Sequence, residues 1–450
     1  MRSWSAERLA AAAGAELLDG RGAGPGPERI TIDSRHVSAG ELFVGLPGEH
    51  VDGGAFVGQA LAAGAWGALA RPERLPAPGG GGVLLACADP LAALQHLATA
   101  WRRELGATVV GITGSTGKTS TKELLLAVLR GRRRAAGSRA NLNTEIGMPI
   151  EILGAPDGTE VLVLEMAMRG AGQIAELAAI AEPDVGVIVN VGPAHLEQLG
   201  SMQRVAAAKS ELLDALAPGA TAVVPAGESL LAPHLRGDLR TITFGGNGDV
   251  RLLADGEHVV EIDALGERLA LEVDFRQEHM RRNLLAAVAA AIAVGVTPSG
   301  RVSLPARPGR GQTVQLAGGV TLIDDCYNAN PMSMRAALDE LAVAVARGGG
   351  SRQIAVLGDM LELGERAHEL HAELGDYAVA KGVALLVTVG QQASAIGERF
   401  TGERHAAADA DEAAAIVPGL IGRGDVVLVK GSRGVKLERV CEALRGGEPA

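Results

Sequence analysis

The feature that most constrains the fold is the alternation of short apolar runs with segments of helical periodicity. In the middle of the chain three such runs stand apart, "TVVGI" (108–112), "EVLVLE" (160–165) and "VGVIVN" (185–190), with helical patterns between them. Strands that alternate with helices form parallel sheets whose faces the helices cover. The pattern predicts a doubly wound parallel α/β sheet.

The last third of the chain repeats this pattern. Its apolar runs are "VTLIDD" (320–325), "QIAVLGD" (353–359), "LLVTVG" (385–390) and "DVVLVK" (425–430), which indicate a smaller, Rossmann-like α/β domain. The segment "VVEIDALGERLALEV" (259–273) is instead typical of a hairpin attached to the middle sheet. The first region carries weaker signals, and we expect a small α/β domain there.

A chain of 450 residues is too long for one ordinary core. The segment "VTPSGRVSLPARPGRGQ" (296–312) separates an alanine-rich helix from a new set of strands. We therefore expect three domains, at residues 1–105, 106–312 and 313–450.

Composition and charge exclude several classes of function. Hydrophobic residues make up 47% of the chain but aromatic residues only 2%, so the cores must consist of Ala, Val, Leu and Ile. The net charge of -11 and the scattered basic residues argue against nucleic-acid binding. No apolar run approaches the ~20 residues that a membrane span needs, so we expect no membrane insertion.

The cysteines indicate a reducing environment. Cys87, Cys326 and Cys441 are odd in number and far apart, which excludes a disulfide framework and a C-x-x-C metal site. We therefore expect a cytoplasmic protein. Independently of the cysteines, we expect a monomer.

The stretch "VVGITGSTGKTSTKE" (109–123) contains the end of a phosphate-binding loop. The usual pattern G-x-x-x-x-G-K-[ST] needs a glycine where this chain has Ile112. The stretch nevertheless follows a β-branched strand and leads into a helix, the context in which backbone N–H groups bind an anion. We predict nucleotide binding rather than a plain turn, with Lys118 at the terminal phosphates and Thr119 on magnesium.

Two polar residues follow predicted strands at the same edge of the sheet. Glu165 ends "VLVLE" and can share a metal ion with Thr119, or be a solvated strand end. His195 comes just after the strand that ends at 190, and its role is either structural or functional. Position alone leaves both alternatives open.

Two helices carry further candidates. In "SMQRVAAAKSELLDAL" (201–216) Lys209 falls on the apolar face, so its side chain either snorkels to water or has been recruited to a site. In "QEHMRRN" (277–283) His279 and Asn283 are one turn apart, and they either cap the helix or contact a purine.

Polar residues also gather near the predicted interdomain junction. Arg310 lies in "RPGRGQ", and an arginine there either stabilises a transferring phosphoryl group or is merely solvated. The stretch "DDCYNANP" (324–331) places four polar residues at a strand end, Asp324, Asp325, Asn328 and Asn330.

Taken together, these segments resemble the Mur ligase family over essentially the whole chain. The family-wide elements are "GSTGKTS" (114–120), "VLVLE", "AHLEQLGS", "AAAKSEL", "HMRRN", "RPGR" and "VKGSRG" (429–434). Three stretches favour the member that adds D-alanyl-D-alanine: "NLNTEIGMP" (141–149), "DDCYNANPMSM" (324–334) and "LGDMLELG" (357–364). Cys326 stands where serine is common in the family.

The resemblance implies ATP-dependent amide formation between UDP-N-acetylmuramoyl-tripeptide and D-alanyl-D-alanine, a step of peptidoglycan precursor synthesis. The tripeptide carboxylate would attack the γ-phosphorus of ATP, and the incoming amine would then attack the acyl phosphate. ATP and Mg²⁺ are the implied cofactors.

The resemblance also implies roles for individual residues. Lys118 and Arg310 would neutralise the transferring phosphate, Thr119, Glu165 and His195 would bind Mg²⁺, and Lys209 would be carbamylated and bridge to metal. The nucleotide-binding set would be Gly114, Ser115, Thr116, Gly117, Lys118, Thr119, Ser120, Asn283, Arg310 and Asp325, with Asn283 at adenine and Asp325 at ribose. The substrate-binding set would be Ser34, Arg35, Asn141, Asn143, Thr144, Asn328, Lys430, Ser432 and Arg433, of which Ser34 and Arg35 would lie near uridine diphosphate.

Two alternative functions remain open at this point. One is a sister ligase that adds a single amino acid, although the "DNPR"-type segment that marks recognition of a diamino acid is absent. The other is a P-loop ATPase without ligase activity, which would need Lys118 but neither Lys209 nor His195.

Overall fold

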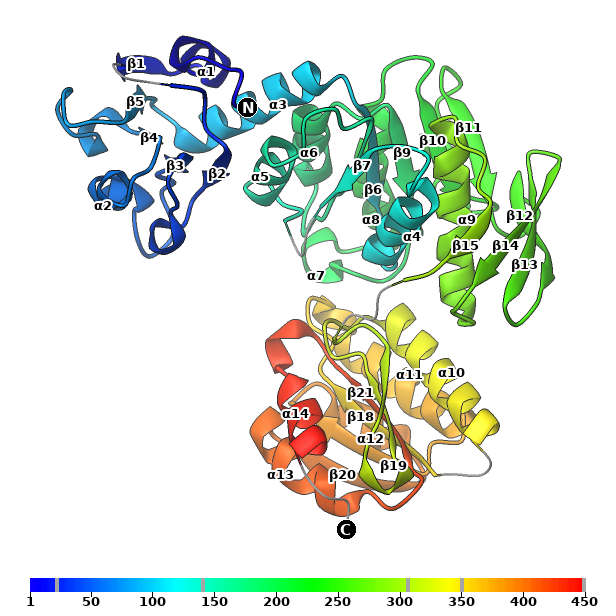
Figure 1. Cartoon of the computed structure of the whole chain (residues 1–450). Coiled ribbons are helices and arrows are strands. Elements are labelled where there is room, and N and C mark those ends of the chain that lie inside the picture. The colour runs from blue at the N-terminus through cyan, green and yellow to red at the C-terminus, as the bar shows by residue number, and fades with distance from the viewer. Residues whose placement is uncertain (21–23, 139–141, 305–307, 349–351, 447–450) are drawn as a thin grey trace.

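The chain is organised around three sheets, each with its own helices (Figure 1). The computed structural model describes residues 1–20, 24–138, 142–304, 308–348 and 352–446. This is the three-domain α/β architecture that the sequence predicts. Asn141, one of the predicted substrate-binding residues, lies outside the described residues.

The first sheet has the strand order β1-β5-β4-β3-β2, and β1 is antiparallel to its neighbour while the other pairs are parallel. Its elements are α1 (Ala6–Ala13), β1 (Glu16–Asp19), β2 (Arg29–Thr31), β3 (Glu41–Val44), α2 (Val57–Ala62), β4 (Gly67–Ala70), β5 (Val83–Ala86) and α3 (Pro90–Leu105). Helix α3 begins where the Asp89 carboxylate accepts hydrogen bonds from two backbone N–H groups, with Pro90 at its first position.

Helix α3 connects the first sheet to the second (Figure 1). It packs against α1, and its Trp101 makes an edge-to-face contact with Trp4, just before α1, at 5.4 Å between ring centroids. Near its end the Arg102 guanidinium donates hydrogen bonds to the carbonyls of Ala181 and Glu182 in the second region. The first two regions are therefore joined by a packed helix rather than by a loose linker.

The second sheet has the order β15-β14-β13-β12-β11-β10-β9-β6-β8-β7. Its strands are β6 (Thr108–Thr113), β7 (Ala135–Gly137), β8 (Val161–Glu165), β9 (Val185–Ile188), β10 (Thr221–Pro225), β11 (Arg240–Phe244), β12 (Val250–Asp255), β13 (Val259–Ala264), β14 (Glu267–Val273) and β15 (Gly300–Val302). Strands β7 to β11 pair in parallel, and β13 with β14 forms the predicted hairpin.

Helices cover both faces of this sheet, which explains why its central strands are continuous apolar runs. One face packs on α4 (Lys118–Leu129) and α9 (Glu278–Ala293), the other on α6 (Gln173–Ala181) and α8 (Met202–Asp214). Shorter helices, α5 (Gly147–Leu153) and α7 (Leu196–Leu199), lie near its edge. Every residue of β8 is buried, including the terminal Glu165.

The third sheet has the order β16-β17-β21-β18-β19-β20, with only β16 antiparallel among the described strands. Its elements are β16 (Gln312–Gln315), β17 (Thr321–Asp324), α10 (Pro331–Gly348), β18 (Gln353–Gly358), α11 (Ala367–Ala380), β19 (Leu385–Val389), α12 (Ser394–Arg399), β20 (Glu403–Ala407), α13 (Ala410–Leu420), β21 (Val426–Lys430) and α14 (Glu438–Gly446). Strand β16 begins at Gln312, so the expected boundary after residue 312 falls just inside it. Within the described ranges, no helix has the length and hydropathy needed to cross a bilayer.

Candidate active site at the phosphate-binding loop

The phosphate-binding loop connects β6 to α4 and depends on glycine at its last position. Gly117 has a φ of 77° and is the N-cap of α4. A Cβ atom there would lie 2.5 Å from Oδ1 of Asn283, well inside van der Waals contact. Both the left-handed backbone and the close approach of Asn283 therefore require glycine.

Asn190, which follows β9, holds this loop in place. Its Oδ1 accepts a hydrogen bond from the backbone N–H of Thr116 at 3.0 Å, and its Nδ2 donates to the Thr116 carbonyl at 3.1 Å. Next to it the Ser115 hydroxyl bonds both the carbonyl and the N–H of Gly192 at 2.9 Å. Sequence reasoning missed Asn190, although it ends the apolar run "VGVIVN" at the edge where ligands gather.

Thr119 and Glu165, predicted as metal ligands, lie together. The Thr119 hydroxyl donates to Oε2 of Glu165 at 2.8 Å, and Asn143 Nδ2 donates to the other carboxylate oxygen at 3.1 Å. The backbone N–H of Glu165 donates to the Ser138 hydroxyl at 3.1 Å. The carboxylate is thus held beside the first turn of α4, which is not the position of a freely solvated strand end.

Two lysines lie at this site, the half-buried Lys118 and the buried Lys209. The ammonium of Lys118 donates to the Gly114 carbonyl at 2.7 Å. Burial lowers the pKa of Lys118, the negative charge of Glu165 opposes that shift, and the positive charge of Arg310 adds to it. The electrostatic influence of Arg310 therefore reaches the phosphate-binding loop from the third region.

Lys209 on α8 is the more unusual of the two. Only 1% of its surface is exposed, so the side chain does not snorkel to water. Burial holds the pKa of Lys209 well below its usual range, and the positive charge of the nearby Lys118 lowers it further. A neutral amine is the form in which a lysine acts as a nucleophile, so this side chain is chemically suited to modification.

His195 stands between the second and third regions. It has a φ of 57°, is the N-cap of α7, and its Nδ1 lies 2.5 Å from Oε2 of Glu362. The same loop makes a backbone hydrogen bond of 3.1 Å from the Glu197 N–H to the Glu362 carbonyl. Sequence reasoning identified "LGDMLELG" but did not single out Glu362.

The third region contributes a cluster around Lys430. The side chain is 2% exposed, and its Nζ donates to Oδ2 of Asp325 at 2.7 Å and to the Asn328 carbonyl at 2.8 Å. Beside it, the Arg310 guanidinium stacks on the ring of Tyr327 at 3.9 Å from the centroid. Stacking on an aromatic ring holds this arginine in place, whereas a solvated linker residue has no such partner.

The third region also contacts the phosphate-binding loop directly. Nδ2 of Asn330 donates to the Ser115 carbonyl at 3.4 Å, and the Met332 side chain packs against Gly192. The candidate site therefore lies at the junction of the second and third regions.

The remaining predicted residues differ in how close they lie to the loop and in how exposed they are. Asn283 is buried under Gly117, and neither it nor His279 caps α9, whose N-cap Gln277 has no side-chain cap bond. Ser432 donates to the Ala329 carbonyl and accepts from the Leu361 N–H, whereas Arg433 is exposed. Ser120 is half-buried in the first turn of α4, and Thr144 is exposed just before α5.

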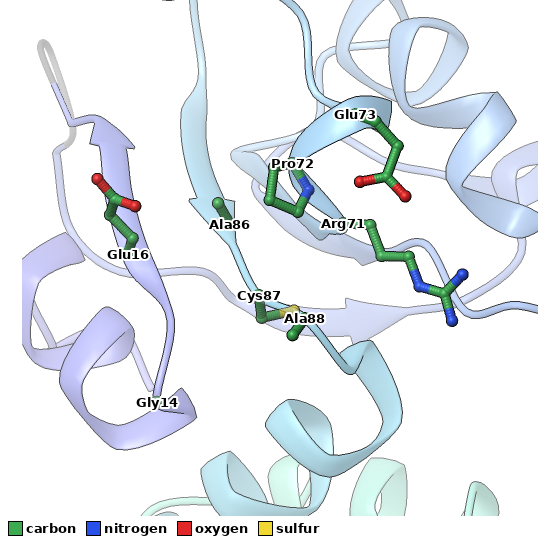
Figure 2. A pocket seen from close by; sticks show the side chains of 8 residues that line it. All are labelled: Gly14, Glu16, Arg71, Pro72, Glu73, Ala86, Cys87 and Ala88. Carbon is green, nitrogen blue, oxygen red and sulfur yellow. The ribbon is translucent and has the colours of Figure 1, made fainter.

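Ser34 and Arg35 lie in the first region. They form a short 3₁₀ turn in which the exposed Arg35 pairs with Asp33 at 2.8 Å. A separate pocket of about 570 Å³ opens on the same region (Figure 2). Its lining contains none of the predicted site residues and consists of Gly14, Glu16, Arg71, Pro72, Glu73, Ala86, Cys87 and Ala88.

Comparisons with known proteins agree with this architecture. Three family models match the chain: "Mur ligase family, catalytic domain" at residues 28–74, "Mur ligase middle domain" at 112–291 and "Mur ligase, glutamate ligase domain" at 309–433.

Curated relatives and solved structures extend the similarity to nearly the full chain. A UDP-N-acetylmuramoyl-tripeptide--D-alanyl-D-alanine ligase of Bacillus subtilis is 33% identical over 96% of this chain and 97% of its own length. The ligase of the same name from Synechocystis is 37% identical over 93% of this chain and 92% of its own length. The crystal structure of MurF from Acinetobacter baumannii superposes with a TM-score of 0.86 at 30% identity over 99% of both chains. The crystal structure of MurF ligase from Thermotoga maritima in complex with ADP superposes with a TM-score of 0.80 at 31% identity, over 93% of this chain and 97% of the other. The chain belongs to the Mur ligase family.

Proposed function

We propose that this protein is an ATP-dependent ligase that joins D-alanyl-D-alanine to UDP-N-acetylmuramoyl-tripeptide with release of ADP and phosphate. The observation that carries the proposal is the pairing of the half-buried Lys118 with the buried Lys209 at a site that also contains the Thr119–Glu165 hydrogen bond. A simple P-loop ATPase has no need of the second lysine. The names of the full-length relatives support the choice of substrates.

The proposed reaction proceeds in two steps. A carboxylate oxygen of the tripeptide attacks the γ-phosphorus of ATP, the bond to the β-phosphate oxygen breaks, and ADP leaves. The amine of the dipeptide then attacks the acyl phosphate carbonyl, and phosphate leaves while the amine loses a proton. Lys118 and Arg310 offset the negative charge that develops during phosphoryl transfer, because both lie beside the loop.

The residues at the loop suit magnesium. The hydroxyl of Thr119 and the carboxylate of Glu165 are hard oxygen donors next to a helix N-terminus, and Mg²⁺ prefers such ligands together with phosphate oxygens. When bound, the ion supplies positive charge at the β- and γ-phosphates. His195 is the candidate ligand of a second ion, with its ring orientation set by Glu362.

Lys209 is the candidate for carbamylation. The neutral amine forms an N–C bond to carbon dioxide and loses a proton, which yields a carboxylate-like side chain. This modification replaces a poorly solvated ammonium by an anion that can pair with a metal ion, and it explains why a lysine occupies a buried helix face.

The substrates would extend across the three domains. Residues 1–105, with Ser34 and Arg35, are proposed to hold the uridine diphosphate, and residues 106–312 to hold ATP. Residues 313–450 would complete the ATP site through Asp325 and hold the dipeptide. The peptide ends would contact Asn143, Thr144, Asn328, Lys430, Ser432 and Arg433, together with Asn141. A cytoplasmic monomer is the form we propose, because ATP and the UDP-linked substrate both belong to that compartment.

The proposal is tested by measuring phosphate release from purified protein with ATP and magnesium. Release should require both UDP-N-acetylmuramoyl-tripeptide and D-alanyl-D-alanine, and unchanged release without the dipeptide would indicate an ATPase. Replacing the dipeptide by meso-diaminopimelate or lysine separates this ligase from a sister enzyme that adds a single amino acid. The dipeptide alone should support turnover.

A further inference from the structure

Two of the three cysteines, which are far apart in the sequence, meet in the third region. Cys326 follows β17 and Cys441 lies on α14. Together with Asp324, the last residue of β17, they form a group in which one candidate ligand atom from each residue lies within 4.8 Å of the others. The exposed fractions of these residues do not exceed 4%.

The internal contacts of this group orient the carboxylate. The Cys326 thiol donates to Oδ1 of Asp324 at 3.1 Å, and the Arg445 guanidinium donates to Oδ2 at 2.6 Å. One carboxylate oxygen is thus turned toward sulfur and the other is neutralised by an arginine.

The surroundings of Cys441 favour its neutral thiol when no cation is bound. Its hydrogen bond with Cys326, reinforced by burial, raises the pKa of the Cys441 thiol. The remaining charges, Asp324 and Arg445, cancel.

We propose that Cys326, Cys441 and Asp324 form a binding site for a thiophilic divalent cation of the Zn²⁺ type. Each thiol releases its proton to solvent and forms a metal–sulfur bond, and Oδ1 of Asp324 exchanges its hydrogen bond for a metal–oxygen bond. Two thiolates, one carboxylate, one guanidinium and one divalent cation sum to zero charge, which a buried site tolerates.

The geometry needs only small adjustments. Zinc–sulfur bonds of about 2.3 Å in a tetrahedral site place ligand atoms just under about 4 Å apart. The fourth position is available to water. The sulfur donors distinguish this site from the oxygen-rich site at Thr119 and Glu165, because thiolates select zinc over magnesium.

The bound ion would connect α14 to the end of β17, directly beside Asp325 and its ion pair with Lys430. Such a link removes freedom from the C-terminal helix and stabilises the third region. The thermal unfolding temperature should therefore rise with zinc concentration.

The same two sulfurs could instead form a disulfide with a peroxide as oxidant, in which case both thiols lose hydrogen and the peroxide is reduced to water. The structure favours the metal, because a third potential ligand, Asp324, faces both sulfurs. The disulfide is an outcome that the test distinguishes.

The test is titration of the full-length, reduced, chelator-treated protein with Co²⁺ in the presence of excess Mg²⁺. We expect one equivalent to give a sulfur-to-cobalt charge-transfer band, which Zn²⁺ removes and further Mg²⁺ does not. The band should be lost in Cys326→Ser and in Cys441→Ser. Cys87→Ser is the matched control, since that buried cysteine lies in the first region, and it should keep the band.

A second measurement uses the unmutated protein and so does not depend on the folding of variants. Zn²⁺ should slow alkylation of Cys326 and Cys441, read by peptide mass spectrometry, and leave Cys87 unaffected. Absence of the charge-transfer band in folded, reduced protein, or its persistence in Cys326→Ser, would overturn the proposal. So would a Cys326–Cys441 disulfide formed under peroxide by a protein that binds no Co²⁺.

Discussion

Nδ1 of His195 lies 2.5 Å from Oε2 of Glu362, and this contact joins the loop after β9 in the second region to the loop after β18 in the third. Both have left-handed backbones, with φ values of 57° and 63°. Non-glycine residues in this conformation persist where surrounding contacts hold them, and such positions concentrate at functional sites. The hydrogen bond from His195 lowers the pKa of Glu362, so the carboxylate stays charged and keeps the imidazole oriented.

We predict that Glu362→Gln lowers kcat by about 10-fold to about 100-fold, which is the usual cost of removing a residue that orients a metal ligand, the role we propose for Glu362 toward His195. Binding of Mn²⁺ in the presence of ADP, followed by electron paramagnetic resonance, should weaken as well. Glu365→Gln is the control, because Glu365 is exposed three residues further along the same loop. Equal losses in both variants would show that the loop acts only through its fold.

Gly117→Ala should damage the nucleotide site. The added methyl group meets Asn283 at 2.5 Å on a backbone with a φ of 77°, and strain of this kind costs ~1–3 kcal/mol. Gly172→Ala is the matched control. Gly172 is also a helix N-cap, with a φ of 85°, but open space surrounds its Cβ position. Calorimetry with ADP should show weak binding for the first variant and normal binding for the second. Equal affinities would contradict the role of the Asn283 contact.

Asn190→Ala removes the side chain that bonds Thr116 through its N–H, its carbonyl and its hydroxyl. Buried hydrogen-bond partners left unsatisfied cost about 1–3 kcal/mol, so the KM for ATP should rise by about 10-fold or more. Thr116→Val removes only the hydroxyl contact and should have a smaller effect. Steady-state kinetics with ATP varied would detect the graded loss, and a KM unaltered by Asn190→Ala would count against the anchoring role.

Lys209 makes stability depend on pH. Its pKa is lowered in the folded protein, so the unfolded chain binds more protons between the folded pKa and the ordinary value of 10.5. In that window the free energy of unfolding of the unmodified, metal-free protein should rise with pH. Lys209→Met should flatten this dependence, increase stability at neutral pH and abolish ligation. Urea unfolding between about pH 6 and about pH 9 tests the slope. Parallel curves for both proteins would refute the burial of a neutral amine.

Local patterns predicted most of the fold. The apolar runs at 108–112 and 160–165 are strands β6 and β8, and the segment 259–273 is the β13–β14 hairpin. These assignments succeed because buried parallel strands and tight turns leave a signal in neighbouring residues. The loop before α4 was recognisable for the same reason, since its chemistry lies within a few positions.

Contacts across regions left no such signal. Glu362 is 167 residues from His195, and Cys326 meets Cys441 only because α14 packs near the end of β17. In the sequence Asn190 is an ordinary strand end, and only the folded structure brings its side chain into hydrogen bonds with Thr116 of the loop. Each of these pairs depends on how separate elements approach one another, which single-sequence periodicity does not encode.

In the proposed reaction a tripeptide carboxylate receives the γ-phosphate of ATP. The most direct test uses tripeptide substrate whose terminal carboxylate carries a heavy isotope of oxygen, with mass analysis of the released phosphate. We expect one heavy oxygen in phosphate for each amide bond formed, because the carboxylate oxygen leaves with the phosphorus. Phosphate without the label would mean that water attacks ATP, and it would contradict ligation through an acyl phosphate.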